Sequence, residues 1–201
     1  MDEALTYAAA VDGDLEVLYQ QAPPVRRLRG VYRTSRHNLS FANAALLWDS
    51  LAPLRLYLDA VDVPRSQDEY DHTVIACALD LERQLDAINA YGGFGIGQKI
   101  VNLFMKDQWA LGAAASLERL LHAPLDRIVL RHVSNRCHLA PSWQAWTKVV
   151  AGNEDAKPVV EYRRLQDWLR SAAADEGLTL IRYEQRLWDA GRDRASAKES
   201  D

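Results

Sequence analysis

The sequence predicts an all-α fold. Apolar side chains recur at helical spacing along most of the 201 residues, and few β-branched runs alternate with a period of two. Hydrophobic residues make up 48% of the chain and charged residues 26%, which is typical of a folded globular domain rather than a disordered chain. A chain of this length holds one domain, or one core built from two closely packed helical lobes.

The first half of the chain contains three predicted helices. The first covers residues 3–20 and ends before the Pro23-Pro24 pair, because proline cannot continue a helix. The arginine-rich residues 25–38 show no clear period, and we expect irregular structure there. Leucines and other apolar residues near helical spacing predict helices over residues 40–57 and 67–91, and the second of these ends at two glycines.

The second half of the chain is expected to begin with a short turn. Residues 94–97 should form a hairpin that opens a helix through about Lys106. Further helices are predicted over residues 111–122, 126–136, 140–150, 156–176 and 179–190, and the polar tail is expected to fray. The single unit 1–201 then divides into an N-terminal helical region (residues 1–91), a central segment (92–136), a C-terminal helical region (137–191) and the tail (192–201).

Charged residues are unevenly distributed, although the net charge is only −4. Residues 25–38 hold five arginines and no acidic residue, and residues 99–148 hold seven basic residues against three acidic ones. Residues 49–90 hold nine acidic residues against three arginines. Such asymmetry is typical of a protein with a face for a polyanion, while solvated helix surfaces stay the alternative interpretation.

Cysteine content and hydropathy predict a cytoplasmic protein. Two cysteines, Cys77 and Cys137, are too few for a four-cysteine iron–sulfur cluster or zinc site, so we expect reduced thiols. The chain contains no run of 18 uncharged apolar residues, so we expect no membrane span. Its acidic N-terminus lacks the basic and apolar regions of a secretory signal.

The segment GGFGIGQKIVNLF, at residues 92–104, is the strongest candidate for a functional site. Gly95 and Gly97 would let a turn approach a ligand closely, and the free N–H groups around Gln98 at the start of the next helix would bind a phosphate. Lys99 follows directly. An uncharged lysine amine is a nucleophile that forms a Schiff base with an aldehyde-level carbon.

A second candidate segment, HAPLDRIVL, follows at residues 122–130. Asp126 occupies an N-cap position before an apolar-periodic helix, so capping is one interpretation. The other is functional, since a carboxylate close to Lys99 would stabilise positive charge that develops on a sugar. The two interpretations are compatible, because a capping carboxylate can also face a cleft.

GFGIGQK followed by PLDRIVL resembles the helix-hairpin-helix DNA glycosylases, specifically the bifunctional 8-oxoguanine glycosylase/AP lyases and the endonuclease III relatives. The D-R-x-x-L form is most similar to the small second-type bacterial and archaeal 8-oxoguanine glycosylases. The match covers roughly residues 88–135, and a weaker similarity lies in YEQRLW at residues 183–188. The resemblance implies a two-lobed helical fold with a helix-hairpin-helix motif and a cleft between the lobes. It also implies that Lys99 and Asp126 are the catalytic residues.

The partner implied by the resemblance is double-stranded DNA that contains an abasic site or a modified base, above all 8-oxoguanine. The implied protein is a prokaryotic, cytoplasmic monomer without membrane association. It would excise the base through a Schiff base on Lys99 and nick the strand by β-elimination, without an organic or redox cofactor. The family commonly holds a monovalent cation on the hairpin carbonyls. No metal is assigned to the three histidines near this region, because their spacing fits no helical ligand pair.

Two further sets of residues are assigned beyond the catalytic pair. Contacts to the DNA backbone are expected from Gly95, Gly97, Gln98, Arg127 and Arg131. The pocket for the extruded base is expected to contain Trp188, Trp143 and His122, because a flipped base stacks on aromatic faces.

Two alternatives stay open. The L-x-S-Q motif of the family is missing from the N-terminal half, so the excised base could be a different one, such as a modified base of phage DNA. The second alternative belongs to another functional class: a non-catalytic helix-hairpin-helix module that binds the DNA backbone. In that module Lys99 and Asp126 would have no chemical role.

Overall fold

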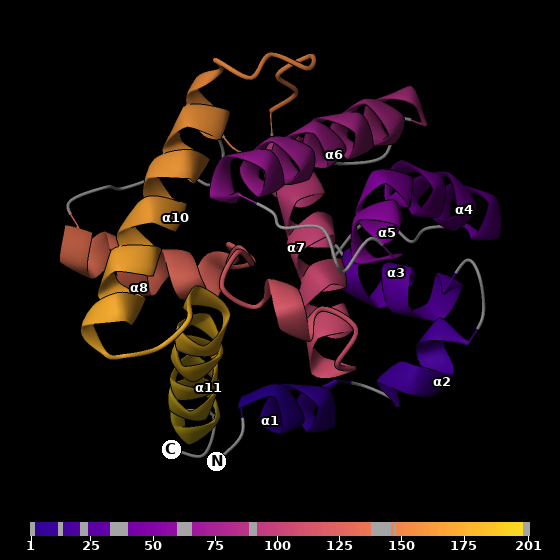
Figure 1. Ribbon diagram of the computed structural model, residues 1–201. Coiled ribbons are helices and arrows are strands. Elements are labelled where there is room, and N and C mark those ends of the chain that lie inside the picture. The colour runs from indigo at the N-terminus through magenta and orange to yellow at the C-terminus, as the bar shows by residue number, and fades with distance from the viewer. Residues whose placement is uncertain are drawn as a thin grey trace.

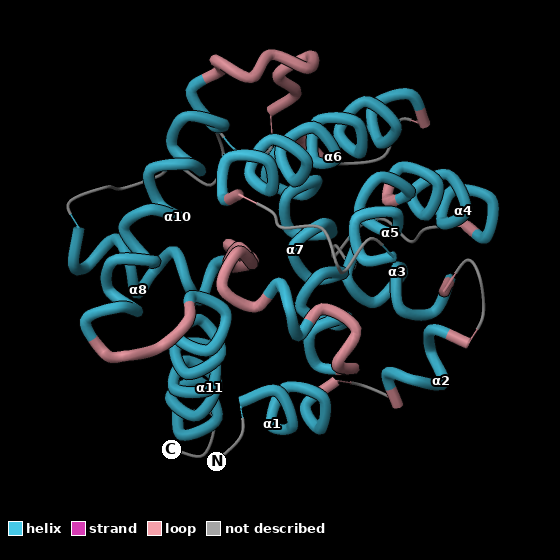
Figure 2. Tube along the Cα trace, viewed as in Figure 1, coloured by secondary structure: helices cyan, strands magenta, loops and turns pink. Residues whose placement is uncertain are grey.

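The computed structural model describes residues 3–11, 14–20, 24–32, 40–59, 66–88, 92–137, 146 and 148–198. Over these residues the chain forms helices joined by turns and loops, without a strand (Figures 1 and 2). The expected all-α class is therefore confirmed. The α-helices are α1 (Glu3–Ala10), α2 (Leu15–Tyr19), α3 (Val25–Tyr32), α4 (Phe41–Ser50), α5 (Ala52–Asp59), α6 (Gln67–Ala87), α7 (Phe94–Ala110), α8 (Arg127–Cys137), α10 (Lys157–Asp175) and α11 (Leu180–Lys198), and η1 (Ala115–Leu117) is a 3₁₀ helix. Within the described ranges, no helix combines the length and apolar character needed to span a membrane.

α7 is the central helix of the fold. Figure 1 shows α2 to α5 on one side of it and α8, α10 and α11 on the other, with α6 near its upper end and α1 near its lower end. α6 packs most extensively against α7, and α1, α3 and α10 also contact it. Thirteen of the seventeen residues of α7 are buried. Polar side chains on this helix therefore lie inside the protein, where they have to find partners.

The first turn of α7 occupies residues 94–97, so the prediction of a hairpin at these residues is wrong. Gly93 is the N-cap of the helix. Its carbonyl accepts hydrogen bonds from the N–H groups of Ile96 (2.9 Å) and Gly97 (3.2 Å). The N–H group of Gly97 is therefore used within the helix rather than presented to a ligand.

The two glycines of this turn allow close packing instead. A Cβ atom at Gly97 would lie 2.2 Å from the carbonyl oxygen of Ala78 in α6. A Cβ atom at Gly95 would lie 2.9 Å from both the Cβ and the carbonyl oxygen of Trp146. The absence of side chains at these positions lets two other segments of the chain reach the backbone of α7.

Three elements in the first half also differ from expectation. Residues 25–38, expected to be irregular, begin with α3, because three of its apolar side chains form a buried stripe behind the arginines. The helix expected over residues 3–20 is two helices, and Asp14 caps the second. The helix expected over residues 40–57 is divided into α4 and α5 at Leu51.

Two elements in the second half differ as well. Residues 111–122, expected to be helical, form turns, η1 and the start of an extended segment, and Gly112 ends α7 with a left-handed φ of +82°. α11 continues through Lys198 and so includes most of the tail that was expected to fray. The helices expected over residues 67–91, 126–136 and 156–176 are confirmed as α6, α8 and α10, whereas most of 140–150 lies outside the described residues. The division into two lobes with a cleft stays a prediction.

Ion pairs fix α1 and the turn after α7 against α11. Glu118 accepts two hydrogen bonds from Arg182, at 2.6 and 2.9 Å, and one each from Trp109 and Thr179. The Arg182 guanidinium also reaches the carboxylate of Glu3 in α1, at 3.1 Å. These contacts join the first and last helices, which are separated by nearly the whole chain.

Candidate active site

A cavity of about 270 Å³ lies where α1, α3, α7, α11 and the extended segment before α8 meet. Lys99 and Asp126, the two residues predicted to carry the chemistry, both line it. They are 27 positions apart in the sequence, and the fold brings them to one place. The other lining residues are Tyr7, Val11, Arg27, Gly30, Val31, Leu103, Lys106, Pro124, Glu184 and Trp188.

One face of α7 directs Lys99 toward the cavity. Lys99, Leu103 and Lys106 are four and three positions apart, so they share a helix face, and all three line the cavity. Lys99 is partly buried, and its amine makes no hydrogen bond or ion pair with the described residues. It is the sixth residue of the helix and lies beyond the first turn, because α7 begins at Phe94.

Asp126 caps α8 and faces the same cavity. Its Oδ1 accepts hydrogen bonds from the N–H groups of Ile128 (2.8 Å) and Val129 (3.0 Å). This is the N-cap geometry that the sequence predicts. Oδ1 takes both bonds, and Oδ2 makes no hydrogen bond with the described residues.

Two buried glutamines hold the extended segment that precedes α8. Gln98 of α7 donates a hydrogen bond to the carbonyl of Leu125 (2.8 Å) and accepts one from its N–H group (3.3 Å). Gln166 of α10 forms the same pair of bonds with Ala123, at 2.8 and 2.9 Å. Side-chain amides therefore satisfy the backbone of this segment, as a neighbouring strand would do in a sheet.

Gln98 thereby connects the two candidate catalytic positions. It directly precedes Lys99, and its partner Leu125 directly precedes Asp126, so its amide sets how the two segments lie against each other. The Gln98 side chain is fully buried, and the contact with the DNA backbone that was expected of it stays a prediction. Gly95 and Gly97 are both buried within α7, and the contacts with the DNA backbone expected of them stay predictions.

Two turns of α7 beyond Lys99, a buried ion pair lines the cavity. Lys106 contacts Glu184 of α11, and its Nζ lies 4.4 Å from the centroid of the Tyr7 ring. Both charged side chains are 2% exposed. Burial raises the pKa of Glu184 and the nearby charge of Asp126 adds to the rise, whereas Lys106 opposes it.

A second buried charge cluster fixes the tyrosine of α1. The carboxylate of Asp107, which is fully buried, accepts hydrogen bonds from the hydroxyls of Tyr7 (2.6 Å) and Tyr19 (2.8 Å). Arg27 adds a two-point ion pair to this carboxylate, at 2.6 and 2.7 Å. Burial lowers the pKa of Arg27, but the hydrogen bonds and charge of Asp107 outweigh it and raise the pKa overall. The cluster keeps the ring of Tyr7 against Lys106.

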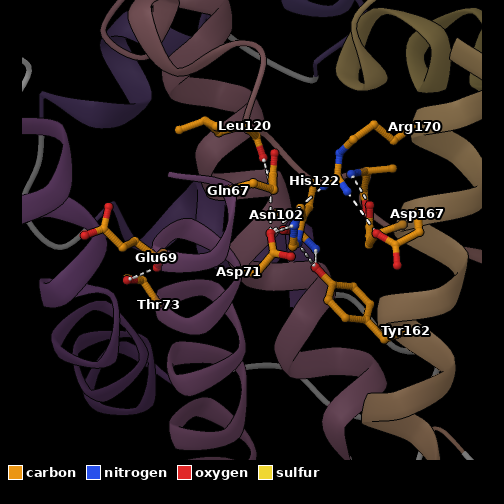
Figure 3. A network of polar contacts seen from close by, with 12 residues as sticks. Gln67, Glu69, Asp71, Thr73, Asn102, Leu120, His122, Tyr162, Asp167 and Arg170 are labelled. Carbon is orange, nitrogen blue, oxygen red and sulfur yellow. Dashed lines mark hydrogen bonds and ion pairs between the residues drawn. The ribbon is translucent and has the colours of Figure 1, made fainter. Parts of the chain in front are cut away.

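His122, which was expected in the base pocket, belongs to a different network. Figure 3 shows its ring between Asp71 of α6 and Tyr162 of α10, with Nε2 2.7 Å from the carboxylate and Nδ1 2.7 Å from the hydroxyl. Burial lowers the pKa of His122, while Asp71 opposes this shift. The ring does not line the cavity, because two hydrogen bonds hold it between α6 and α10, and its place in a base pocket stays a prediction.

The other expected contact residues lie in three places. Trp188 of α11 lines the cavity, as expected for a residue that stacks on a base. Arg127 and Arg131 are exposed on α8, in its first two turns. Trp143 lies outside the described residues.

The described portion of the chain lacks a cluster of side chains that could bind a metal ion together. No group of three His, Cys, Asp or Glu side chains gathers there as ligands. The hairpin that was expected to hold a monovalent cation is a helical turn, in which the Gly95 carbonyl accepts a hydrogen bond from Gln98 at 2.9 Å.

Four cavity residues with polar side chains were not assigned a role from the sequence: Tyr7, Arg27, Lys106 and Glu184. A signal existed for Lys106, because a lysine two turns after Lys99 shares its helix face and interrupts an apolar helix. Arg27 and Glu184 lie in segments that were noted in the sequence, but their pairing was not predictable, since the partners of both residues lie on distant helices.

In comparisons with protein-family models, curated proteins and solved structures, nothing matches the chain.

Proposed function

We propose that the chain is a bifunctional DNA glycosylase/AP lyase that excises an oxidised or otherwise modified base, with 8-oxoguanine as the first candidate. The observation that supports the proposal is the shared cavity of Lys99 and Asp126. This chemistry requires at least an amine and a carboxylate at one site, and in this cavity the Lys99 amine and the Asp126 Oδ2 both lack a partner among the described residues.

In the first step the uncharged Lys99 amine attacks C1′ of the target nucleotide. The bond between C1′ and the base breaks, and its electron pair leaves with the base, which takes up a proton. Asp126 stabilises the positive charge on the sugar and accepts the proton that the amine loses. The product is an aminal that joins the lysine to the sugar.

In the second step O4′ takes up a proton and the sugar ring opens, which leaves C1′ double-bonded to the lysine nitrogen. Loss of a proton from C2′ then expels the phosphate oxygen from C3′ and nicks the strand. Water hydrolyses the Schiff base and regenerates the lysine. The sequence of steps consumes no oxidant or reductant.

DNA would have to present the target outside the helix, because a stacked base cannot reach a cavity. Trp188 offers the extruded base an aromatic face. Arg127 and Arg131 are exposed next to the Asp126 cap, where they would neutralise phosphates without reading sequence.

The test is covalent trapping. Duplexes that contain 8-oxoguanine or an abasic site are incubated with the protein and sodium borohydride, which reduces a Schiff base to a stable adduct. The wild-type protein should form the adduct, and Lys99→Gln should form none while still binding the duplex. Lys157→Gln is the matched control, since Lys157 is an 80% exposed lysine that does not line the cavity, and it should behave as wild type.

A second variant tests the carboxylate. Asp126→Asn should slow base release about 100-fold, because asparagine cannot accept the proton. The amide oxygen still caps α8, so the thermal unfolding temperature should stay close to that of the wild type. Unchanged base release in this variant would contradict the role of Asp126.

The remaining outcomes separate the alternatives. A duplex affinity that falls as salt rises, without any adduct on abasic DNA, would identify a non-catalytic DNA-binding module. An adduct on abasic DNA without excision of 8-oxoguanine would indicate a different modified base, to be found with a panel of modified duplexes.

A further inference from the structure

The buried Lys106–Glu184 pair has no role in the steps above, yet it lines the cavity in which they would occur. Burial of opposite charges is costly unless the pair is fully hydrogen-bonded, and such pairs inside a cavity are often functional. Glu184 contacts Lys106 through Oε2, whereas its Oε1 makes no hydrogen bond with the described residues. The cavity therefore contains an unused acceptor directly beside an ammonium donor.

The position of the pair fits a base whose sugar lies at Lys99. Lys106 follows Lys99 by two turns, about 10 Å along the axis of α7. A nucleobase attached at C1′ would extend from Lys99 toward Lys106 and Glu184. At about 270 Å³ the cavity is slightly smaller than most ligand sites, which span about 300–1,000 Å³, and this size suits one ring system rather than a nucleotide.

We propose that Lys106 and Glu184 form the subsite that reads the far edge of the extruded base, and that this subsite selects a 2-amino-6-oxopurine. The inference rests on the proposed glycosylase function. Glu184 accepts hydrogen bonds from N1–H and the 2-amino group, and Lys106 donates one to O6.

The hydrogen-bond donors and acceptors of the two side chains support this choice of base. A carboxylate only accepts and an ammonium only donates, so the subsite needs a base edge with N–H donors beside a carbonyl acceptor. One N–H of Lys106 is directed to Glu184 and the Tyr7 ring covers another side, which leaves a donor for the ligand. An adenine edge has its donor where guanine has O6, so its amino group would meet the ammonium and leave both charges without a match.

The experiment compares three bases that share the C8 oxidation and differ only at this edge. Single-turnover excision is measured for 8-oxoguanine, 8-oxohypoxanthine, which lacks the 2-amino group, and 8-oxoadenine. The wild-type protein should prefer 8-oxoguanine over 8-oxoadenine by about 10- to 100-fold, with 8-oxohypoxanthine in between. An equal rate for all three bases would overturn the subsite.

Two variants test the assignment to this pair. Glu184→Gln should lose the preference among the three bases, measured as the ratio of their single-turnover excision rates. The double variant Lys106→Met/Glu184→Leu replaces both charges together and avoids leaving one buried without a partner. It should show the same loss of preference, and a preserved preference in either folded variant would refute the assignment.

Affinity measurements separate this inference from the glycosylase proposal. The Lys99→Gln protein should bind the 8-oxoguanine duplex more tightly than the 8-oxoadenine duplex by a similar factor, since binding needs no cleavage. A preference in binding without any adduct from the wild-type protein would support the subsite and reject the lyase. An adduct without any base preference would support the lyase and reject the subsite.

Discussion

Replacement of Gly97 by alanine should destabilise the protein through a single backbone contact. The new Cβ would lie 2.2 Å from the carbonyl oxygen of Ala78 and 3.1 Å from its carbonyl carbon. Ordinary van der Waals contact begins near 3.4 Å, so α6 and α7 would have to separate locally by roughly 1 Å. Because the obstacle is backbone, no side-chain rotation can relieve the clash.

The size of the loss in unfolding free energy follows from two opposing effects. Overpacking of a well-packed core costs about 1–3 kcal/mol, and a rigid obstacle places this site at the upper end. Alanine is about 1 kcal/mol more favourable than glycine inside a helix, which offsets some of that cost. We therefore expect the free energy of unfolding to fall by about 2 kcal/mol in Gly97→Ala.

Urea unfolding followed by circular dichroism measures this loss. With a denaturant slope of about 2 kcal/mol per molar urea, the midpoint should fall by about 1 M. Gly30→Ala is the matched control, because Gly30 is helical and its Cβ would meet no atom within 4 Å. That variant should be as stable as the wild type or slightly more stable. An unchanged midpoint in Gly97→Ala, or an equal loss in both variants, would refute the packing argument.

The remaining predictions concern buried and half-buried charges. Arg27→Met leaves the fully buried carboxylate of Asp107 without its cation, so unfolding should become easier by about 3–5 kcal/mol in a thermal melt. The neighbouring Arg26 is exposed, and Arg26→Met should melt as the wild type does. Hydrogen bonds from Arg182 hold the pKa of Glu118 at about 2, below its ordinary 4.5, so their contribution is complete above pH 4.5 and is lost as the pH falls toward 2. Glu118→Gln should therefore show a weaker decline of the urea midpoint over this pH range than the wild type, and an identical decline would contradict the assignment.

Local rules explain which elements were predictable. Apolar spacing predicts α6 and α10, and a proline followed by Asp126 predicts the start of α8, because each signal lies within a few residues of the element. The turn at residues 94–97 was not predictable in this way. Glycines permit both a tight turn and a close helix contact, and only Ala78, on another helix, decides between them.

The candidate site likewise contains some residues that were predictable from the sequence and others that were not. The resemblance of two short motifs to a known family led to Lys99 and Asp126, and the structure brings both to one cavity. The charge pairs around them were not predictable, because Lys106 and Glu184 are 78 positions apart and Arg27 and Asp107 are 80 apart. Hydrophobic periodicity does not predict which charged side chains will form ion pairs over such sequence separations.

The walls of the cavity come from both ends of the chain, since α1 supplies Tyr7 and α11 supplies Glu184 and Trp188. Proteins emerge from the ribosome N-terminal end first, and domains fold as their last elements appear. A nascent chain that stops before α11 would expose Lys99 and Asp126 to bulk water, without the helix that closes the space around them. The closed space around Lys99 and Asp126 would thus form only after α11 has been synthesised.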